Sequence, residues 1–276
     1  MFNLNRIHFF KWTHTTIYEE KNVTIRLIRN ATLRIHYAGK EILVDPMLAE
    51  KGTLQSALGV YKTPRVHLTM PMNEITDGLD MVLLTHNHID HYDPTVKQHL
   101  AKNILFLTQP QDKESITQDG FTNVESIEKD KAIGNLTIHR IQGHHGFGKI
   151  GEMMGPVSGY VLTAHGFPTI YIMSDCKWED CIRQAIEQFS PDYIIVNSGG
   201  AIFPEFSQTE GSIIPDEQEV MTMLDELPAH IKLIAVHMEA TDHGQTTRAI
   251  LRNEAMHHKI EMSRLIIPED GETIIL

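Results

Sequence analysis

The chain has 276 residues, of which 41% are hydrophobic and 22% are charged, enough to form one large domain or two ordinary ones. Its formal net charge of −12 argues against a broad nucleic-acid-binding face, which would need excess lysine and arginine. No apolar run approaches the roughly 18 residues of a membrane span. No signal peptide is evident, and the two cysteines, Cys176 and Cys181, do not indicate a disulfide framework, so we expect a cytoplasmic protein.

The first half of the chain opens with strand-like runs at residues 24–29, 32–37 and 41–44. Short turn-type sequences separate them, which predicts an antiparallel meander. The Asp45-Pro46 dipeptide should end the third strand. Residues 47–78 show little periodicity and predict a long surface loop. Loops of this length are often functional lids.

Further strands are predicted where short apolar runs are followed by polar or turn residues. The first of these runs is residues 81–85, which is followed by a short helix at residues 96–102. The remaining strands of this part of the chain are predicted at residues 104–107, 136–142, 158–163 and 169–173.

The last part of the chain predicts alternation of helices with strands. The helices are expected at residues 178–189, 215–227 and 246–257, the strands at residues 193–196 and 231–236, and a closing hairpin at residues 265–267 and 273–276. Each half therefore begins with strands and ends with helix–strand alternation, which indicates two sheets packed face to face with helices outside. We expect an N-terminal arm over residues 1–23 and a single domain over residues 24–276.

The sequence HNHIDH, directly behind the strand at residues 81–85, concentrates potential metal ligands. Residues two apart in an extended segment point the same way, so His86 and His88 can aim at one point. Asp90 and His91 are adjacent and diverge, which suits a second point a few ångströms away if the chain turns there. Four ligands in two directions exceed what a polar surface loop needs and indicate a metal site.

Complementary ligands should lie at other strand ends, where a loop meets solvent. Three predicted strands are followed by such residues: His144 or His145 in QGHHGFG, Asp175 in YIMSDCKW, and His237 in LIAVHMEATDH. Each alone could be an ordinary polar residue at a strand end. Together, behind the HNHIDH stretch, they predict the far side of one site.

With these residues in place, the sequence resembles the metallo-β-lactamase superfamily over residues 24–276. The five motifs that carry the resemblance are Asp45 in ILVDP, HNHIDH, the histidine of GHHG, Asp175 in SD, and His237 in VHME. The resemblance implies a four-layer αββα sandwich of the α/β (α+β) class, which agrees with the predicted element order. It also implies a dinuclear metal site at the edge between the two sheets.

The resemblance assigns a ligand set by residue. The first metal would be bound by His86, His88 and the third-motif histidine, the second by Asp90, His91 and His237, and Asp175 would bridge both. Asp45 would orient a histidine of HNHIDH through a hydrogen bond rather than bind metal. Its alternative is a cap at the end of a strand.

The third motif is ambiguous because it offers two histidines. Its sequence resembles relatives in which a single histidine precedes Gly-x-Gly, and this favours His145. His144 would then face away from the metals or contact substrate.

Two residues are candidates for proton transfer. Asp90 is placed to accept the proton of the attacking water and return it. His243, six residues beyond His237, could contact substrate or act as an acid. The alternative for His243 is a solvent-facing position before a helix.

The departures from the family's branches narrow the expected function. The bridging position holds Asp175 rather than the cysteine of one β-lactamase branch, and the interval to His237 is too short for the domain inserted in nucleic-acid-processing relatives. The chain looks most like the compact branch that includes ascorbate-phosphate lactonase and N-acylethanolamine phospholipase D. It predicts a hydrolase in which a dinuclear site activates water to attack a small ester, lactone, amide or phosphodiester.

The implied cofactors are two divalent metal ions, with zinc the family's commonest choice and manganese or iron as alternatives. The expected partner is a small-molecule substrate, without nucleic acid or a membrane span, and the sequence is compatible with a homo-oligomer. Two other functions stay open: a mononuclear iron oxygenase-type enzyme on the same fold, and a non-catalytic binding or sensor protein.

Overall fold

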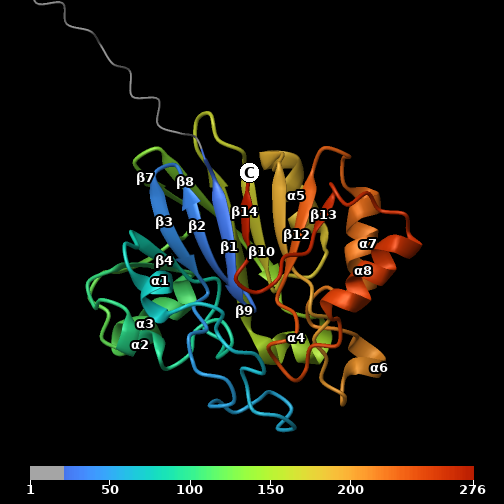
Figure 1. Cartoon of the computed structure of the whole chain (residues 1–276), viewed down its shortest axis with the longest axis horizontal. Coiled ribbons are helices and arrows are strands. Elements are labelled where there is room, and N and C mark those ends of the chain that lie inside the picture. The colour runs from blue at the N-terminus through green and yellow to red at the C-terminus, as the bar shows by residue number, and fades with distance from the viewer. Residues whose placement is uncertain (1–21) are drawn as a thin grey trace, which may run out of the picture.

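Two seven-stranded sheets pack face to face in the computed structural model, which describes residues 22–276 (Figure 1). The first sheet contains, in spatial order, β14 (Thr273–Ile275), β1 (Thr24–Arg29), β2 (Thr32–Tyr37), β3 (Lys40–Val44), β4 (Met81–Leu83), β5 (Leu105–Thr108) and β6 (Val124–Ser126). Strands β14 to β3 are antiparallel neighbours, whereas β3 to β6 run parallel. The sheet is therefore mixed.

The second sheet repeats this plan. It contains, in spatial order, β13 (Leu265–Ile266), β12 (Lys232–Val236), β11 (Tyr193–Asn197), β10 (Ile170–Ser174), β9 (Pro156–Thr163), β8 (Leu136–His144) and β7 (Asp130–Ile133). Strands β7 to β10 are antiparallel, and β10 to β13 are parallel. The parallel strands end at the same edge, so the residues that follow them are brought close together.

Helices cover the outer face of each sheet (Figure 1). On the side of the first sheet lie α1 (Met72–Thr76), α2 (Val96–His99), the 3₁₀ turn η1 (Pro110–Asp112) and α3 (Lys113–Gln118). Beyond the second sheet lie α5 (Asp180–Phe189), α7 (Glu217–Glu226) and α8 (Arg248–His257), and the short helices α4 (Gly148–Met154) and α6 (Ser207–Glu210) lie at one end of the sandwich.

Three hydrophobic clusters separate the layers. The central cluster packs the inner faces of both sheets together, with side chains such as Ile35 and Ile42 from the first sheet and Ile138 and Ile234 from the second. A second cluster lies between the second sheet and α5, α7 and α8, and a third between the first sheet and α1–α3. Burial of each such side chain contributes roughly 2 kcal/mol. The result is the four-layer αββα sandwich that the sequence predicts.

The predicted closing hairpin is wrong. Strand β13 pairs in parallel with β12, whereas β14 pairs antiparallel with β1 in the other sheet. The connecting segment is fixed instead by the buried Arg248, which donates hydrogen bonds to the carbonyl of Pro268 at 2.7 Å and to the carboxylate of Asp270. Each sheet thus gains one edge strand, and the C-terminal strands join the two sheets.

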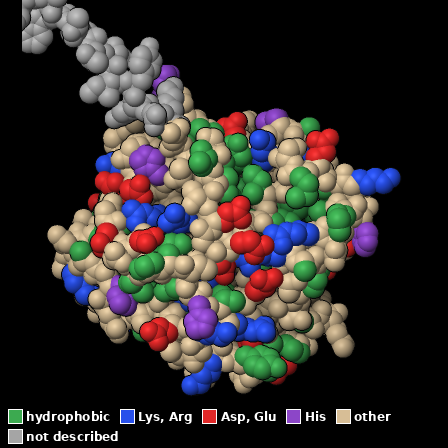
Figure 2. All heavy atoms as spheres, viewed as in Figure 1, with side chains coloured by type: hydrophobic (Ala, Val, Ile, Leu, Met, Phe, Trp, Pro, Cys, Tyr) green, Lys and Arg blue, Asp and Glu red, His purple; other side chains and the backbone are tan. Residues whose placement is uncertain are grey.

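The predicted long loop at residues 47–78 contains α1 and an antiparallel bridge between Leu54 and Thr63. This bridge closes residues 54–63 into a flap. The predicted arm at residues 1–23 lies outside the described residues except for its last two. In the described part of the chain no helix is long and apolar enough to cross a membrane. Acidic and basic side chains intermingle on the face shown in Figure 2.

Candidate metal centre

Polar side chains from four strand ends converge at one edge of the sandwich. His86, His88, Asp90 and His91 follow β4, His145 follows β8, Asp175 follows β10 and His237 follows β12. All except the half-buried His88 are at most 9% exposed. A dense group of buried imidazoles and carboxylates is costly to remove from water unless its members are paired or bind a cation.

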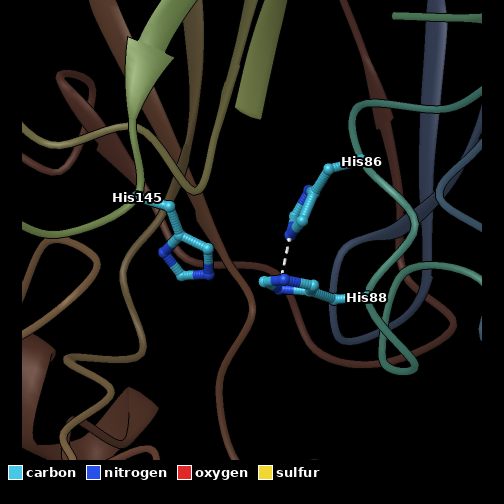
Figure 3. A group of neighbouring side chains, drawn as sticks. All are labelled: His86, His88 and His145. Atoms are coloured by element: carbon cyan, nitrogen blue, oxygen red, sulfur yellow. Dashed lines mark hydrogen bonds between the residues drawn. The ribbon is translucent and has the colours of Figure 1, made fainter. Parts of the chain in front are cut away.

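The first donor group consists of His86, His88 and His145. One ring nitrogen from each lies within 4.8 Å of the other two. Figure 3 shows His86 and His88 approaching from one segment and His145 from the opposite side. Nε2 of His86 lies 3.1 Å from Nδ1 of His88. Three imidazoles facing one point are a typical donor set for a divalent transition metal.

The second donor group consists of Asp90, His91 and His237, whose ligand atoms also lie within 4.8 Å of one another. Nε2 of His91 is 3.1 Å from Nε2 of His237, and the same His237 atom is 3.2 Å from a carboxylate oxygen of Asp90. This group therefore adds a carboxylate to two imidazoles.

Asp175 lies between the two groups. Its Oδ2 is 3.2 Å from Nε2 of His145 and 3.2 Å from Nε2 of His91, so one oxygen faces a member of each group. Its Oδ1 accepts a hydrogen bond of 2.6 Å from the side-chain amide of Asn197. The amide fixes the orientation of the carboxylate, and this central position suits a ligand shared by two ions.

Four of the five imidazoles contact an oxygen through the nitrogen that faces away from the cluster. These contacts are His86 Nδ1 to Thr85 Oγ1 at 3.0 Å, His88 Nε2 to Met154 O at 3.0 Å, His91 Nδ1 to Asp45 Oδ2 at 2.8 Å, and His145 Nδ1 to Ile213 O at 3.1 Å. Carbonyl and carboxylate oxygens only accept, so the outer nitrogens of His88, His91 and His145 must donate. In the neutral form of each ring, the inner nitrogen then presents a lone pair.

Thr85 extends this reasoning to His86. The Thr85 hydroxyl donates its single proton to Asp45 at 2.7 Å, so its oxygen must accept from Nδ1 of His86. The inner nitrogens of His86 and His88 are then two lone pairs facing each other at 3.1 Å. Such a contact repels unless a cation lies between the nitrogens. The residues therefore fit a bound metal, with outer partners that set each tautomer.

The charges of the cluster point the same way. Burial lowers the pKa of His145 to about 4, which keeps this imidazole neutral and ready to bind metal. Burial also favours neutral His91, but the carboxylates of Asp175, Asp45 and Asp90 outweigh it and raise the pKa of His91 well above 6.5. Despite the opposing effect of burial, His91 and His237 hold the pKa of Asp175 well below its usual value. The carboxylates thus stay ionised and attract a cation.

Backbone conformation helps to bring these side chains together. Asp45, Ser174 and His237 follow or end strands and adopt positive φ angles of 44°, 60° and 65°. Non-glycine residues rarely adopt such angles, which cost about 1–3 kcal/mol each and concentrate at functional sites. The sharp turns direct Asp45, Asp175 and His237 to the edge of the sandwich.

Of the remaining predicted site residues, some lie inside the donor groups and others outside them. His145 lies in the cluster, whereas the side chain of His144 is 66% exposed and pairs with Glu179 at 2.8 Å. Asp45 contacts His91 and stands outside the donor groups. His243 also stands outside them, but it is 9% exposed and lines a pocket of about 210 Å³ next to the cluster.

Sequence reasoning missed Thr85 and Asn197, which contact the candidate ligands His86 and Asp175. The sequence predicts Thr85 only as the last residue of a strand, although it directly precedes His86. Asn197 follows the same rule that identifies Asp175 and His237, because it ends the parallel strand β11. A polar residue at that strand end was therefore a usable signal.

Comparisons with known proteins agree on one family for this chain. Residues 40–238 match the sequence model described as the beta-lactamase superfamily domain. The UPF0173 protein YddR of Bacillus subtilis is 34% identical over 91% of this chain and 99% of its own. A UPF0173 metal-dependent hydrolase of Xanthobacter autotrophicus is 23% identical over 62% of this chain and 69% of its own.

Two solved structures are similar along nearly their whole length. The structure of a possible metal-dependent hydrolase from Veillonella parvula is 31% identical with a TM-score of 0.87, covering 92% of this chain and 99% of that one. The structure of isothiocyanate hydrolase from Delia radicum gut bacteria is 34% identical with a TM-score of 0.83, covering 91% and 98%. The strand-end cluster is thus carried by a fold shared with proteins described as hydrolases.

Proposed function

Because the chain belongs to the beta-lactamase superfamily, we propose that it is a hydrolase whose cluster binds two divalent metal ions. The observation that carries the proposal is the position of Asp175, whose Oδ2 lies 3.2 Å from a nitrogen of each donor group. Each donor group offers three ligand atoms of its own, and Asp175 adds a carboxylate oxygen near both. Two donor groups sharing one carboxylate favour a dinuclear centre over a mononuclear iron enzyme.

The proposed ligands follow the donor groups. His86, His88 and His145 would hold one ion, Asp90, His91 and His237 the other, and Asp175 both. Nitrogen and oxygen donors suit zinc, with manganese and iron as alternatives. Asp45 would hold His91 in its metal-binding tautomer. The described cysteines are both free, which supports a reducing, cytoplasmic location.

Bound divalent ions supply Lewis acidity, which lowers the pKa of water to about 7 and polarises a carbonyl or phosphoryl oxygen. The chain's own groups then move the protons. Asp90 lines the pocket and is held ionised by its histidine neighbours, so its carboxylate can accept a proton from water and deliver it to a leaving group. His243 lines the same pocket and is a second candidate for proton transfer or substrate contact.

The substrate proposed from the sequence is a small ester, lactone, amide or phosphodiester. An isothiocyanate is a second candidate, supported by the relative of that name, whose structure is 34% identical over 91% of this chain. The central carbon of an isothiocyanate is an electrophile that water can attack, as is a carbonyl carbon. Both candidates use the same water-activating site.

Metal analysis and a substrate panel test the proposal. Purified protein should hold about two divalent ions per chain. An Asp175→Ala variant should lose metal and activity together, because the affinity for metal depends on a complete set of ligands. The panel should pair p-nitrophenyl esters and a lactone with bis-p-nitrophenyl phosphate and an alkyl isothiocyanate. A metal-loaded protein that leaves the whole panel intact would favour a binding or sensor role.

A further inference from the structure

The pocket beside the metal cluster has a distinct chemical character. It is lined by both donor groups on one side and by the flap at residues 54–63 on another. Its volume of about 210 Å³ is below the roughly 300–1,000 Å³ of pockets that hold drug-sized ligands. The space therefore suits a compact molecule.

No lysine or arginine lines this pocket among the described residues. Lys177, buried near the cluster's strands, already pairs with Glu219 and donates to Ser212 at 3.1 Å. The two carboxylates that line the pocket, those of Asp90 and Asp175, are proposed metal ligands, so the wall offers no cationic side chain to a charged substrate tail. An anionic group on the substrate, away from the reacting atom, would thus be buried without a partner.

The rest of the wall is apolar or uncharged. Met154, Phe203 and Ile213 face the pocket from one side, and Ala57 and Ile89 from others. Apolar walls with few polar groups favour a substrate body of the same character. Resting on the proposed hydrolase function, we propose that this pocket selects a compact, uncharged, largely apolar substrate, and that Asp242 sets its size limit by fixing the flap over the cluster.

Asp242 anchors the flap through its carboxylate. The oxygens accept hydrogen bonds from the backbone N–H groups of Leu58, Val60 and Tyr61 at 3.3, 3.1 and 3.2 Å. The Asp242 side chain is fully buried beneath these bonds. Three donors on one ionised carboxylate form a charge-assisted anchor, so the flap tip is held although Val60 and Tyr61 are 63% and 61% exposed.

The anchor also lies next to a pocket-lining residue in the sequence. Asp242 directly precedes His243, which lines the pocket together with the flap residues Gln55 and Ala57. Movement of the flap would therefore change the distance between the pocket roof and the cluster without touching a metal-binding side chain. Asp242 is a positioning residue in this arrangement.

Charge selection is tested with matched substrates. p-Nitrophenyl butyrate and p-nitrophenyl hemisuccinate have similar length, but the second ends in a carboxylate. The metal-loaded protein should hydrolyse the butyrate with at least about tenfold higher kcat/KM, because burial of an unpaired charge is costly. An Ala57→Lys variant should lower the ratio of kcat/KM for the butyrate to kcat/KM for the hemisuccinate. Val60→Lys, on the same flap but outside the pocket lining, should leave this ratio unchanged. A wild-type preference for the hemisuccinate would overturn the inference.

A binding measurement separates this inference from the proposed reaction. Butyrohydroxamate and succinic monohydroxamate differ in the same charge and need no turnover to be compared by calorimetry. The neutral ligand should bind at least about tenfold more tightly to metal-loaded protein. If neither ester is hydrolysed but the neutral hydroxamate is preferred, the hydrolase function falls and the pocket inference stands. Equal affinities, or a preference for the anion, would refute the pocket inference.

The size limit is tested through Asp242→Asn. This variant keeps the shape of the side chain but replaces one acceptor oxygen with a donor. Rates for p-nitrophenyl octanoate relative to butyrate should rise about tenfold, while metal content is unchanged. Amide exchange at residues 58–61 should accelerate by at least about tenfold. Asp80→Asn is the matched control, because Asp80 accepts the Glu41 N–H at 2.9 Å at the opposite end of the strands.

The wild-type protein provides a test that needs no folded variant. The amides of Leu58, Val60 and Tyr61 should exchange more slowly than that of the neighbouring Gly59, which donates none of the three bonds to Asp242. Uniformly fast exchange across the four residues would show that the carboxylate does not hold the flap. Unchanged exchange and chain-length preference in Asp242→Asn would also refute its positioning role.

Discussion

Asp45 and His91 are joined by a hydrogen bond of 2.8 Å from Nδ1 of the imidazole to Oδ2 of the carboxylate. The same carboxylate accepts the backbone N–H of Thr85 at 2.8 Å and its hydroxyl at 2.7 Å. Asp45 therefore connects the end of β3 to the segment that carries four of the candidate ligands. Its three contacts fix both the position of that segment and the tautomer of His91.

Replacing Asp45 with Asn should weaken metal binding without unfolding the protein. The amide oxygen can replace only one of the two carboxylate oxygens, so at least one of the three bonds is lost. The negative charge that favours the metal-binding tautomer is lost as well. Partners of this kind are worth about 10–100-fold in metal affinity. Competition with a fluorescent chelator measures the change. Asp80→Asn, which alters a carboxylate far from the cluster, should keep wild-type affinity, and equal affinities for all three proteins would exclude the role.

The two neighbouring histidines of the GHHG motif should behave differently. His145→Ala removes a buried donor from the first group and should lower metal content by about one ion per chain. His144→Ala removes an exposed pair with Glu179, worth at most about 1 kcal/mol, and should leave metal content unchanged. Metal analysis of the two variants after identical purification compares them. Loss of metal in the His144 variant alone would reverse the assignment.

Much of the fold follows from local patterns in the sequence. The meander of β1–β3 and the alternating helices and strands of the second half have strong periodicity and clear turn signals, and they lie where the sequence predicts them. The superfamily suggested by the five motifs is confirmed by the match over residues 40–238. Metal-ligand candidates could be found because their residue types are chemically selective and follow strands.

Other features depend on contacts between distant segments, which periodicity does not encode. The strands at residues 265–266 and 273–275 look like a hairpin, and only the buried Arg248 and the open edges of two sheets separate them. Likewise, GHHG offers two equivalent candidate ligands, and the direction in which β8 ends decides that the side chain of His145 turns toward the cluster. Thr85 and Asn197, which contact candidate ligands, were missed because threonine and asparagine are common at strand ends for other reasons.

Removal of metal should make the free energy of unfolding fall as pH rises through the folded pKa of His91. In the metal-free protein the pKa of His91 lies above 6.5, its unfolded value, mainly because Asp175, Asp45 and Asp90 outweigh burial. A raised folded pKa contributes stability that is fully present below the unfolded pKa and is lost as pH rises through the folded value. A bound cation replaces the proton, so metal-loaded protein should not lose this contribution.

Denaturant unfolding between about pH 6 and pH 9 measures the effect, with unfolding free energies compared at each pH. The free energy of unfolding of the metal-loaded protein should exceed that of the metal-free protein by an amount that grows with pH. This difference should reach about 3–4 kcal/mol when free metal is about 100–1,000 times its dissociation constant. The carboxylates do not produce this trend. The pKa values of Asp90 and Asp175 are lowered, so their contribution is present above about 3.8 and is lost only in acid. An advantage that is independent of pH would argue against protonated His91 in the metal-free state.

Asp90→Asn tests the proton-transfer role within the proposed reaction. Asp90 lines the pocket, and its Oδ2 lies 3.2 Å from Nε2 of His237. The asparagine amide preserves the shape of the side chain and one oxygen that can bind metal, but it cannot accept a proton. With saturating metal, kcat should fall by about 10²–10⁴-fold, the range for general acid–base catalysis, while KM changes little. Metal content is measured on the same samples, because Asp90 is also a candidate ligand. Asp175→Asn should differ because it should lower the metal content as well as the rate. A wild-type rate in metal-replete Asp90→Asn would exclude Asp90 as the proton acceptor.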